Sequence, residues 1–397
     1  MLETPKLKSC INMLAMPARD MNEHARASTP LELFFDLVTV IAIASAAAGL
    51  HHGLLEGHIV ESLLKYLGAF FAIWWAWMNY SWFASAYDND DTLFRLLTLW
   101  IMAGALTMAA GIGPFFAQLD LTVLVSGFVM MRVGMIALWL RAARHDLERR
   151  ASSLIYAIGI AIAQAYWLAL LAADATNLTL FAELFALGIV IELAVPALAE
   201  WKAATPWHSH HITERYGLLN LIVLGETLLA GSMALAKLDA DHMNWALVSL
   251  AICALMILFS MWWLYFSRDN YVVQRERKVV FLWGYGHFLI YLSGAAVGAG
   301  FAVLVDGHAS AHIDAHTTLS ETLSLYTIAL PLALYWLGVW LVRDQFIMAN
   351  GARLVLPAFA VLMLLVPLLG SLLAISVLAV VCVMVRSQCP CENAATH

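Results

Sequence analysis

Asp36, Arg132 and Glu226 are ionisable side chains that lie well inside long apolar runs of this sequence, and Glu183 and Glu192 are further carboxylates in such a run. At the centre of a membrane-spanning helix such a group costs at least about 2.5 to 3.5 kcal/mol, so a chain keeps it where it meets a partner, water or a pathway. A carboxylate there is protonated, paired or hydrated, and these states suit the movement of a proton or an ion. A structural hydrogen bond between helices is the other role open to these groups.

The segment Thr29-Pro30-Leu31-Glu32 has the form of a capping box with proline at the first helical position. Glu32 is therefore a candidate for a structural cap at the start of a helix. Asp36 follows four residues later, on the same face and about 6 Å deeper. Because no capping role remains for Asp36, we expect a pathway or helix-pairing carboxylate there.

A second group of polar residues begins at Glu214 and Arg215, which we take as structural or capping residues. Arg215 and Glu226 are eleven residues apart, so a helix places them on one face but about 16 Å apart along its axis. Glu226 therefore has no partner in its own helix near the middle of the membrane. Arg132 is a candidate counter-ion, and Asn220 is a further pathway candidate.

His287, Tyr291, Gly294 and Gly298 follow a spacing of four, three and four residues, which places them on one stripe of a helix. Small residues at this spacing favour close helix packing. The imidazole could titrate near neutral pH and relay a proton with Tyr291. A packed histidine bonded to another helix fits the pattern equally well, and both interpretations stay open.

No Gly-x-Ser-x-Gly elbow, Walker loop, dinucleotide fingerprint or His-Glu-x-x-His helix occurs in the sequence. We therefore expect no enzyme, no cofactor and no catalytic residues. Histidines cluster in polar connecting segments, where a solvated loop is the simpler interpretation and no metal site is expected. Five scattered cysteines are too few for a disulfide framework.

The composition indicates the elements that position these groups. Hydrophobic residues make up 62% of the 397 residues and charged residues 12%, against roughly 45 to 50% and about 25% in soluble domains. The mean hydropathy is +0.80. This excludes a soluble multidomain enzyme and predicts a polytopic membrane protein. The net charge of −7 describes no nucleic-acid surface, so nucleic acid is not an expected partner.

Uninterrupted apolar runs predict about twelve membrane-spanning helices, because each crossing needs about 20 apolar residues. The runs are 33–52, 62–84, 93–116, 120–141, 152–173, 178–199, 215–236, 244–266, 278–304, 321–342, 352–368 and 370–387. The last two must separate at Pro367-Leu-Leu-Gly370, since 36 continuous residues exceed one crossing. Two spans and one broken re-entrant hairpin both remain open for 352–387.

The positions of Lys and Arg predict the orientation, because short cytosolic loops carry an excess of both. Eighteen of the 21 fall on one side of the predicted spans, Lys65 and Lys237 flank the other side, and Arg132 lies within a span. Both termini should therefore be cytosolic, with 1–30 as an N-terminal segment and 389–397 as a tail.

The two halves of the chain echo each other at an offset of about 180 residues. Glu32-Leu-Phe-Phe-Asp matches the segment that starts at Glu214, and Arg95-Leu-Leu-Thr-Leu-Trp matches Lys278-Val-Val-Phe-Leu-Trp. Six spans in each half restore the same orientation, so we expect a parallel duplication of 31–200 and 201–388 about an axis along the membrane normal.

Four strings recur in this order in one family: Thr29-Pro-Leu-Glu-Leu-Phe-Phe-Asp-Leu-Val, Tyr87-Asp-Asn-Asp-Asp with Arg95-Leu-Leu, Glu214-Arg-Tyr-Gly-Leu-Leu-Asn-Leu-Ile-Val-Leu-Gly-Glu-Thr, and Gly286-His-Phe-Leu-Ile-Tyr-Leu. The chain resembles bacterial low temperature requirement A (LtrA) proteins over about 30–387. Tyr216 departs from the pattern, which often has His there. The resemblance implies a membrane protein that supports growth in the cold, with no substrate or reaction attached.

These observations together predict an all-α bundle in the bacterial inner membrane that acts as a proton-linked secondary transporter or permease of unknown substrate. Asp36, Glu226 and His287 are expected to converge on one polar cluster inside it. Its partners would be membrane lipids and a small molecule or ion, and the sequence does not indicate an oligomeric state. The alternative is a non-transporting membrane factor that binds a lipid or a partner protein.

Overall fold

The structure is a computed structural model that describes residues 15–21, 23, 26–172, 178–236, 245–268, 276–310 and 319–391. Within these residues the regular structure is helical, and β pairing is limited to an isolated bridge between Met348 and Cys391. The all-helical fold class predicted from the apolar runs is confirmed.

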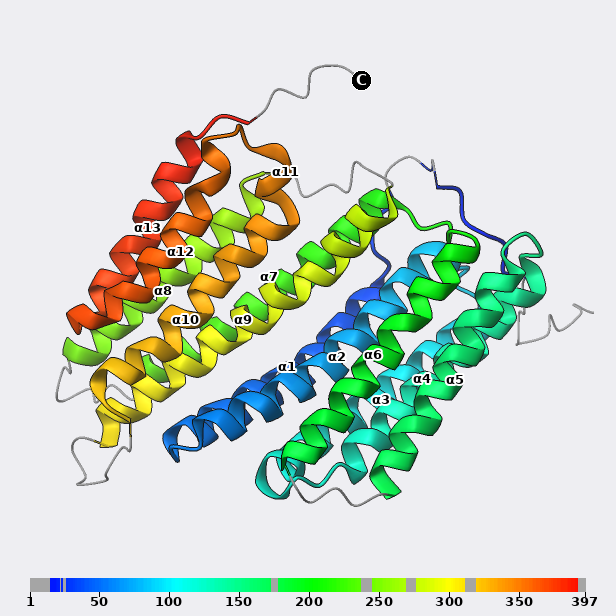
Figure 1. Ribbon diagram of the computed structural model, residues 1–397, viewed down its shortest axis with the longest axis horizontal. Coiled ribbons are helices and arrows are strands. Elements are labelled where there is room, and N and C mark those ends of the chain that lie inside the picture. The colour runs from blue at the N-terminus through cyan, green and yellow to red at the C-terminus, as the bar shows by residue number, and fades with distance from the viewer. Residues whose placement is uncertain are drawn as a thin grey trace, which may run out of the picture. The chain divides into compact units, whose positions relative to one another are not determined.

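The helices follow one another along the chain with short connections (Figure 1). They are α1 (Pro30–Leu55), α2 (Ile59–Tyr87), α3 (Thr92–Gln118), α4 (Thr122–His145), α5 (Arg150–Ala172), α6 (Leu178–Lys202), α7 (Ser209–Ala236), α8 (Trp245–Phe266), α9 (Arg277–Ser310), α10 (Glu321–Val339), α11 (Gln345–Ile347), α12 (Val355–Leu365) and α13 (Leu372–Gln388). Each of the twelve predicted runs coincides with a helix or a short succession of helical turns.

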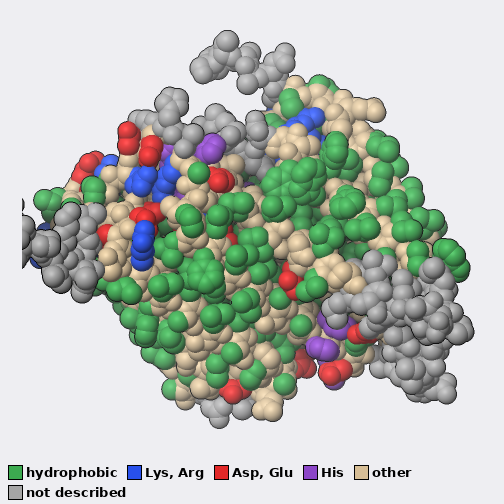
Figure 2. Space-filling model, turned by 180° about the vertical axis from the view of Figure 1, so that it is seen from behind, with side chains coloured by type: hydrophobic (Ala, Val, Ile, Leu, Met, Phe, Trp, Pro, Cys, Tyr) green, Lys and Arg blue, Asp and Glu red, His purple; other side chains and the backbone are tan. Residues whose placement is uncertain are grey.

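The described helices have the dimensions and the surface of membrane spans. Ten of them are long and apolar enough to cross a bilayer, and α13 is a shorter apolar helix. Large hydrophobic side chains are exposed along the helices, such as Phe34 (51%), Ile162 (60%) and Val361 (61%). On the face seen in Figure 2, hydrophobic side chains predominate. Such an apolar surface suits contact with lipid, and the chain is a membrane protein.

The chain divides into two compact units. The first unit comprises 1–42 and 72–212, and the second comprises 43–71 and 213–397. In the first unit, α3, α4, α5 and α6 pack as consecutive neighbours. In the second, α10 packs against α9 and α12, and α13 packs against α8 and α12. The predicted duplication of 31–200 and 201–388 stays a prediction.

Glycines allow α3 and α4 to approach until their backbones touch. A Cβ atom at Gly127 would overlap the backbone nitrogen of Met108, and one at Gly111 would overlap that of Leu124. Only glycine leaves room for this approach. The close crossing fixes the position of α4, which carries Arg132.

The C-terminal helices contain two breaks, and the first of them positions polar groups. A π-helical turn, Trp340–Asp344, follows α10 and holds Arg343 and Asp344. A 3-10 turn, Val366–Leu369, follows α12, and Gly370 then adopts φ +65° before α13 begins. The predicted separation at Pro367–Gly370 is confirmed, because the left-handed conformation of Gly370 reverses the chain there.

Candidate functional site

A buried ion pair lies in the middle of four helices of the first unit. Glu192 comes from α6, Arg132 from α4, Gln164 from α5 and Trp75 from α2. Each residue lies ten or more positions from either end of its helix, except that Gln164 lies eight positions from the end of α5. Because a helix rises about 1.5 Å per residue, these groups stand near the mid-plane of the spans.

Both oxygens of the Glu192 carboxylate accept hydrogen bonds. Oε2 accepts from Nη2 of Arg132 and from Nε1 of Trp75, the latter at 2.8 Å. Oε1 accepts from Nε1 of Trp167 at 3.1 Å and from Nε2 of Gln164 at 3.2 Å. Arg132 is fully buried and Glu192 is 1% exposed. Both oxygens of the Glu192 carboxyl group are thus engaged by donors from α2, α4 and α5.

The arginine of this pair keeps unused donors. Nε and Nη1 of Arg132 have no hydrogen-bond partner among the described residues, and neither does Oε1 of Gln164. The face of the guanidinium lies 4.9 Å from the ring centre of Phe128, a cation–π contact. Buried polar atoms are nearly always paired, so each of these three atoms could take a further polar partner.

The pair is poorly explained as a stabilising element. Replacing a buried ion pair by apolar residues is often neutral or stabilising by about 1 to 4 kcal/mol, because each ion loses its hydration on burial. In a lipid environment the surrounding helices could close over apolar side chains without that loss. The Arg132–Glu192 pair therefore fits a functional role better than a purely structural one.

A second buried charge network lies at the start of α1. Thr29 and Glu32 form the reciprocal bonds of a capping box, with the Thr29 amide donating to Glu32 at 2.8 Å. Nε2 of His211 lies 3.0 Å from the same carboxylate. Arg26 lies 3.9 Å from Glu32 and 3.5 Å from Asp88. Burial, together with the Glu32 charge, raises the pKa of Asp88 to about 6, and Arg26 opposes that rise.

Asp36 is fully buried in the same unit, one turn deeper than Glu32. Its Oδ1 accepts a hydrogen bond of 2.7 Å from Nε1 of Trp77, on α2. The bond joins α1 to α2, as the helix-pairing interpretation of Asp36 requires. The pathway interpretation stays a prediction.

His287 lies in an aromatic cluster of the second unit. Its Nδ1 is 2.7 Å from the carbonyl oxygen of Trp283, which can only accept, so Nδ1 carries the proton. Nε2 is then free to accept from the Tyr265 hydroxyl at 3.0 Å. The Tyr291 hydroxyl donates to the carbonyl oxygen of Tyr216 at 2.8 Å. These bonds satisfy a neutral, packed histidine, and the relay interpretation stays a prediction.

The remaining predicted residues of the second unit lie on α7. Asn220 is buried and donates to the Tyr335 hydroxyl at 3.0 Å, whereas Glu226 is half-buried. Arg215 is fully buried and Glu214 is half-buried. The roles that the sequence predicted for these four residues stay predictions.

The predicted cluster of Asp36, Glu226 and His287 draws on both units, with Asp36 in the first and the other two in the second. Its convergence stays a prediction. Arg132 pairs with Glu192 within the first unit, and its assignment as a counter-ion for Glu226 stays a prediction. Arg132 and Glu192 are sixty residues apart, and the sequence contains no feature that relates two such distant positions. Their pairing follows from the three-dimensional structure, in which α5 packs against both α4 and α6.

Gln164 and Trp167 were not identified from the sequence as partners of a buried charge. A lone glutamine within the apolar run 152–173 was the available signal, since an amide in a span needs a partner. Within the described part of the chain, no group of three or more His, Cys, Asp or Glu side chains could hold a metal ion. Two histidines of the polar connecting segments for which no metal site was expected, His312 and His316, lie outside the described residues.

Comparisons with known proteins find related sequences. An uncharacterized protein of Rhizobium meliloti (strain 1021) is 25% identical over 305 residues, which cover 72% of this chain and 71% of the relative. No solved structure matches the chain. The family model described as bacterial low temperature requirement A protein (LtrA) matches residues 27–387. The chain therefore belongs to the bacterial LtrA family.

Proposed function

We propose that the chain is a proton-linked secondary transporter or permease, with Glu192 as the proton-binding carboxylate and Arg132 as its switching partner. The observation that carries this proposal is the buried Arg132–Glu192 pair, whose guanidinium keeps two donors without partners among the described residues. A pair at mid-membrane depth that leaves donors available suits a group that changes partners. Transporters place coupling sites at this depth.

The chemistry of the pair gives a simple exchange. When a proton binds Glu192, the carboxyl group becomes neutral and its attraction for Arg132 falls. Nε, Nη1 and Nη2 of Arg132 are then available to a polar or anionic group of a substrate. Release of the proton restores the carboxylate, which competes with the substrate for the guanidinium. The proton and the substrate are thereby linked through one arginine.

The proposal places the protein in the bacterial inner membrane with both termini in the cytosol. The distribution of Lys and Arg supports this orientation, since eighteen of 21 fall on one side of the predicted spans. The twelve predicted spans return the chain to the side on which it began. Duplication of 31–200 and 201–388 would fit this topology.

The alternative function, a non-transporting membrane factor, and the transporter predict different phenotypes for a variant that lacks the Arg132–Glu192 pair. A deletion strain would carry the wild-type gene, the double variant Arg132→Met/Glu192→Gln, or Glu183→Gln. Glu183 is a matched control because it is an exposed carboxylate on the same helix, α6.

Untargeted metabolite comparison of cells and medium is the measurement. Transport predicts that at least one metabolite shifts between cells and medium in the deletion strain, and that the double variant fails to restore it while Glu183→Gln restores it. Full restoration of both metabolites and cold growth by the double variant would contradict the proposal and favour a role that does not use the pair.

A further inference from the structure

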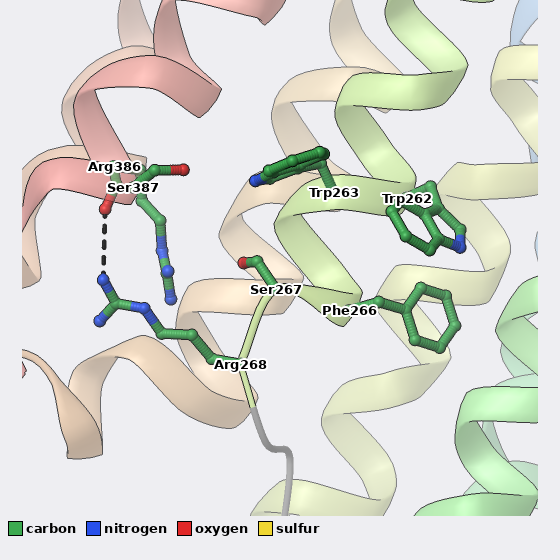
Figure 3. Close-up of a pocket in the computed structure, with 7 residues that line it drawn as sticks. All are labelled: Trp262, Trp263, Phe266, Ser267, Arg268, Arg386 and Ser387. Carbon is green, nitrogen blue, oxygen red and sulfur yellow. Dashed lines mark hydrogen bonds between the residues drawn. The ribbon is translucent and has the colours of Figure 1, made fainter.

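A pocket of about 430 Å³ opens at the C-terminal ends of α8 and α13 in the second unit. Figure 3 shows the guanidinium groups of Arg268 and Arg386 on one side of the pocket and the rings of Trp262 and Trp263 on the other, with Ser267 between them. Cationic and aromatic side chains thus share one concave surface.

The arginines at and beside this pocket outnumber the carboxylates that they contact. Asp344 accepts from Nε and Nη2 of Arg386, at 2.9 and 2.7 Å, and from Nε of Arg343 at 2.9 Å. Arg268 donates to backbone carbonyl oxygens, that of Cys389 at 2.8 Å among them, and to the sulfur atoms of Met348 and Cys391. Two guanidinium groups thus share the Asp344 carboxylate, and the third, that of Arg268, contacts no carboxylate among the described residues. The three arginines together exceed their described carboxylate partner by two positive charges.

One donor of this cluster is unused although it is deeply buried. Arg386 is 1% exposed, and its Nη1 has no hydrogen-bond partner among the described residues. Arg343 is occupied by the last carbonyl groups of α8, those of Leu264 and Tyr265. Arg386, a pocket-lining residue, therefore keeps a buried donor without a partner among the described residues. An anionic oxygen would satisfy it and offset the excess charge.

The surroundings of the pocket suit a lipid. Trp262 and Trp263 are 44% and 51% exposed near the end of a membrane-spanning helix, where tryptophan favours the level of lipid headgroups. Toward the middle of α8, Ile252 and Phe259 expose 53% and 60% of their surface, an apolar face for acyl chains. Arg268 and Arg386 belong to the side predicted to be cytosolic, and the cytoplasmic leaflet attracts basic residues through its anionic lipids.

We propose that this pocket binds the phosphate headgroup of an anionic phospholipid. The phosphate oxygens would accept from Arg268, from Nη1 of Arg386 and from the Ser267 hydroxyl, while the acyl chains lie along α8. Phosphate recognition by paired arginines is the chemistry that this donor set supplies. The site is separate from the Arg132–Glu192 pair and does not depend on transport.

The test is lipid retention by the purified full-length protein, counted by native mass spectrometry after addition of phosphatidylglycerol or phosphatidylcholine. Arg268→Gln removes one pocket charge without touching Asp344, and Trp263→Ala removes one wall of the pocket. Arg144→Gln is the matched control, because it removes an exposed arginine of α4 that lines no part of the pocket. Monodispersity in size-exclusion chromatography establishes that each variant folds.

The wild-type protein and Arg144→Gln should retain phosphatidylglycerol in preference to phosphatidylcholine. Arg268→Gln should weaken retention of phosphatidylglycerol about tenfold, as the loss of one hydrogen bond between charged groups predicts. Excess inorganic phosphate should compete only weakly, because the acyl chains also contribute to binding. Equal retention of both lipids, or of phosphatidylglycerol by wild type, Arg268→Gln and Trp263→Ala alike, would overturn the proposal. Displacement of the lipid by inorganic phosphate alone would also overturn it, by assigning the pocket to free phosphate.

Discussion

Removing one partner of a buried ion pair is more disruptive than replacing both, and this asymmetry distinguishes the roles of Arg132 and Glu192. Glu192→Gln leaves the Arg132 charge without compensation at mid-membrane, which should cost about 3 to 5 kcal/mol. Arg132→Met/Glu192→Gln should recover most of this loss, because the amide oxygen introduced at position 192 can still accept from the tryptophans. Thermal unfolding in detergent measures both. A double variant as unstable as the single one would show that the charge pair itself stabilises the fold.

Asp88 provides a pH dependence whose sign follows from its raised pKa. Its carboxyl has an ordinary pKa of 3.8 when the chain is unfolded and about 6 in the folded protein, where burial disfavours the charge. The folded state therefore binds the proton more tightly, so this group's contribution to stability is complete below pH 4 and is lost as the pH rises to about 6. The full effect corresponds to roughly 3 kcal/mol.

The variant Asp88→Asn should flatten the decline in thermal stability between pH 4 and pH 7, as followed by unfolding scans at a series of pH values. Asp120→Asn is the control: Asp120 is exposed, and hydrogen bonds from Thr122 lower its pKa, so its removal should leave the decline in place. An unchanged slope in Asp88→Asn would show that Asp88 does not bind the proton in this pH range.

At the scale of the elements, the crossing of α3 and α4 depends on the absence of side chains. Gly127→Ala places a Cβ against the backbone of Met108 and should destabilise the protein by about 1 to 3 kcal/mol through overpacking. Gly113→Ala is a matched control on α3, because a Cβ there meets nothing within 4 Å. Fluorescence-detected size-exclusion chromatography after heating compares the two. Equal stability of both variants would contradict the close crossing.

The sequence predicted each helix of this architecture because apolar runs of the right length have few alternatives in a membrane. It also predicted the capping box at Thr29 and Glu32 and the separation at Pro367–Gly370, since both depend on local geometry. Partners between helices were not predictable in the same way. Arg386 was counted with the cytosolic arginines, yet it is buried against Asp344, forty-two residues away, because the π-helical turn after α10 points that carboxylate inward.

At the scale of the whole molecule, the predicted orientation can be tested from outside intact cells. Glu56 lies in the exposed turn between α1 and α2, and Glu148 lies in the exposed turn between α4 and α5. Each would be replaced by cysteine, as Glu56→Cys and Glu148→Cys. A membrane-impermeant maleimide should label the first and leave the second protected until the membrane is permeabilised. Likewise, the segment 304–320 is predicted to be labelled from outside, and the segment 142–150 is predicted to stay protected. Reversed labelling would invert the orientation and place the α8–α13 pocket at the outer leaflet.

The most direct test of the account is proton movement coupled to substrate through the Arg132–Glu192 pair. Wild-type protein, Arg132→Met/Glu192→Gln and Glu183→Gln would each be reconstituted into liposomes that contain a pH-sensitive dye. The metabolite identified from the deletion strain would then be added outside. The account predicts that wild type and Glu183→Gln change the internal pH as substrate enters, and that the folded double variant does not. An equal pH change with the double variant, or substrate entry by wild type without any pH change, would contradict it.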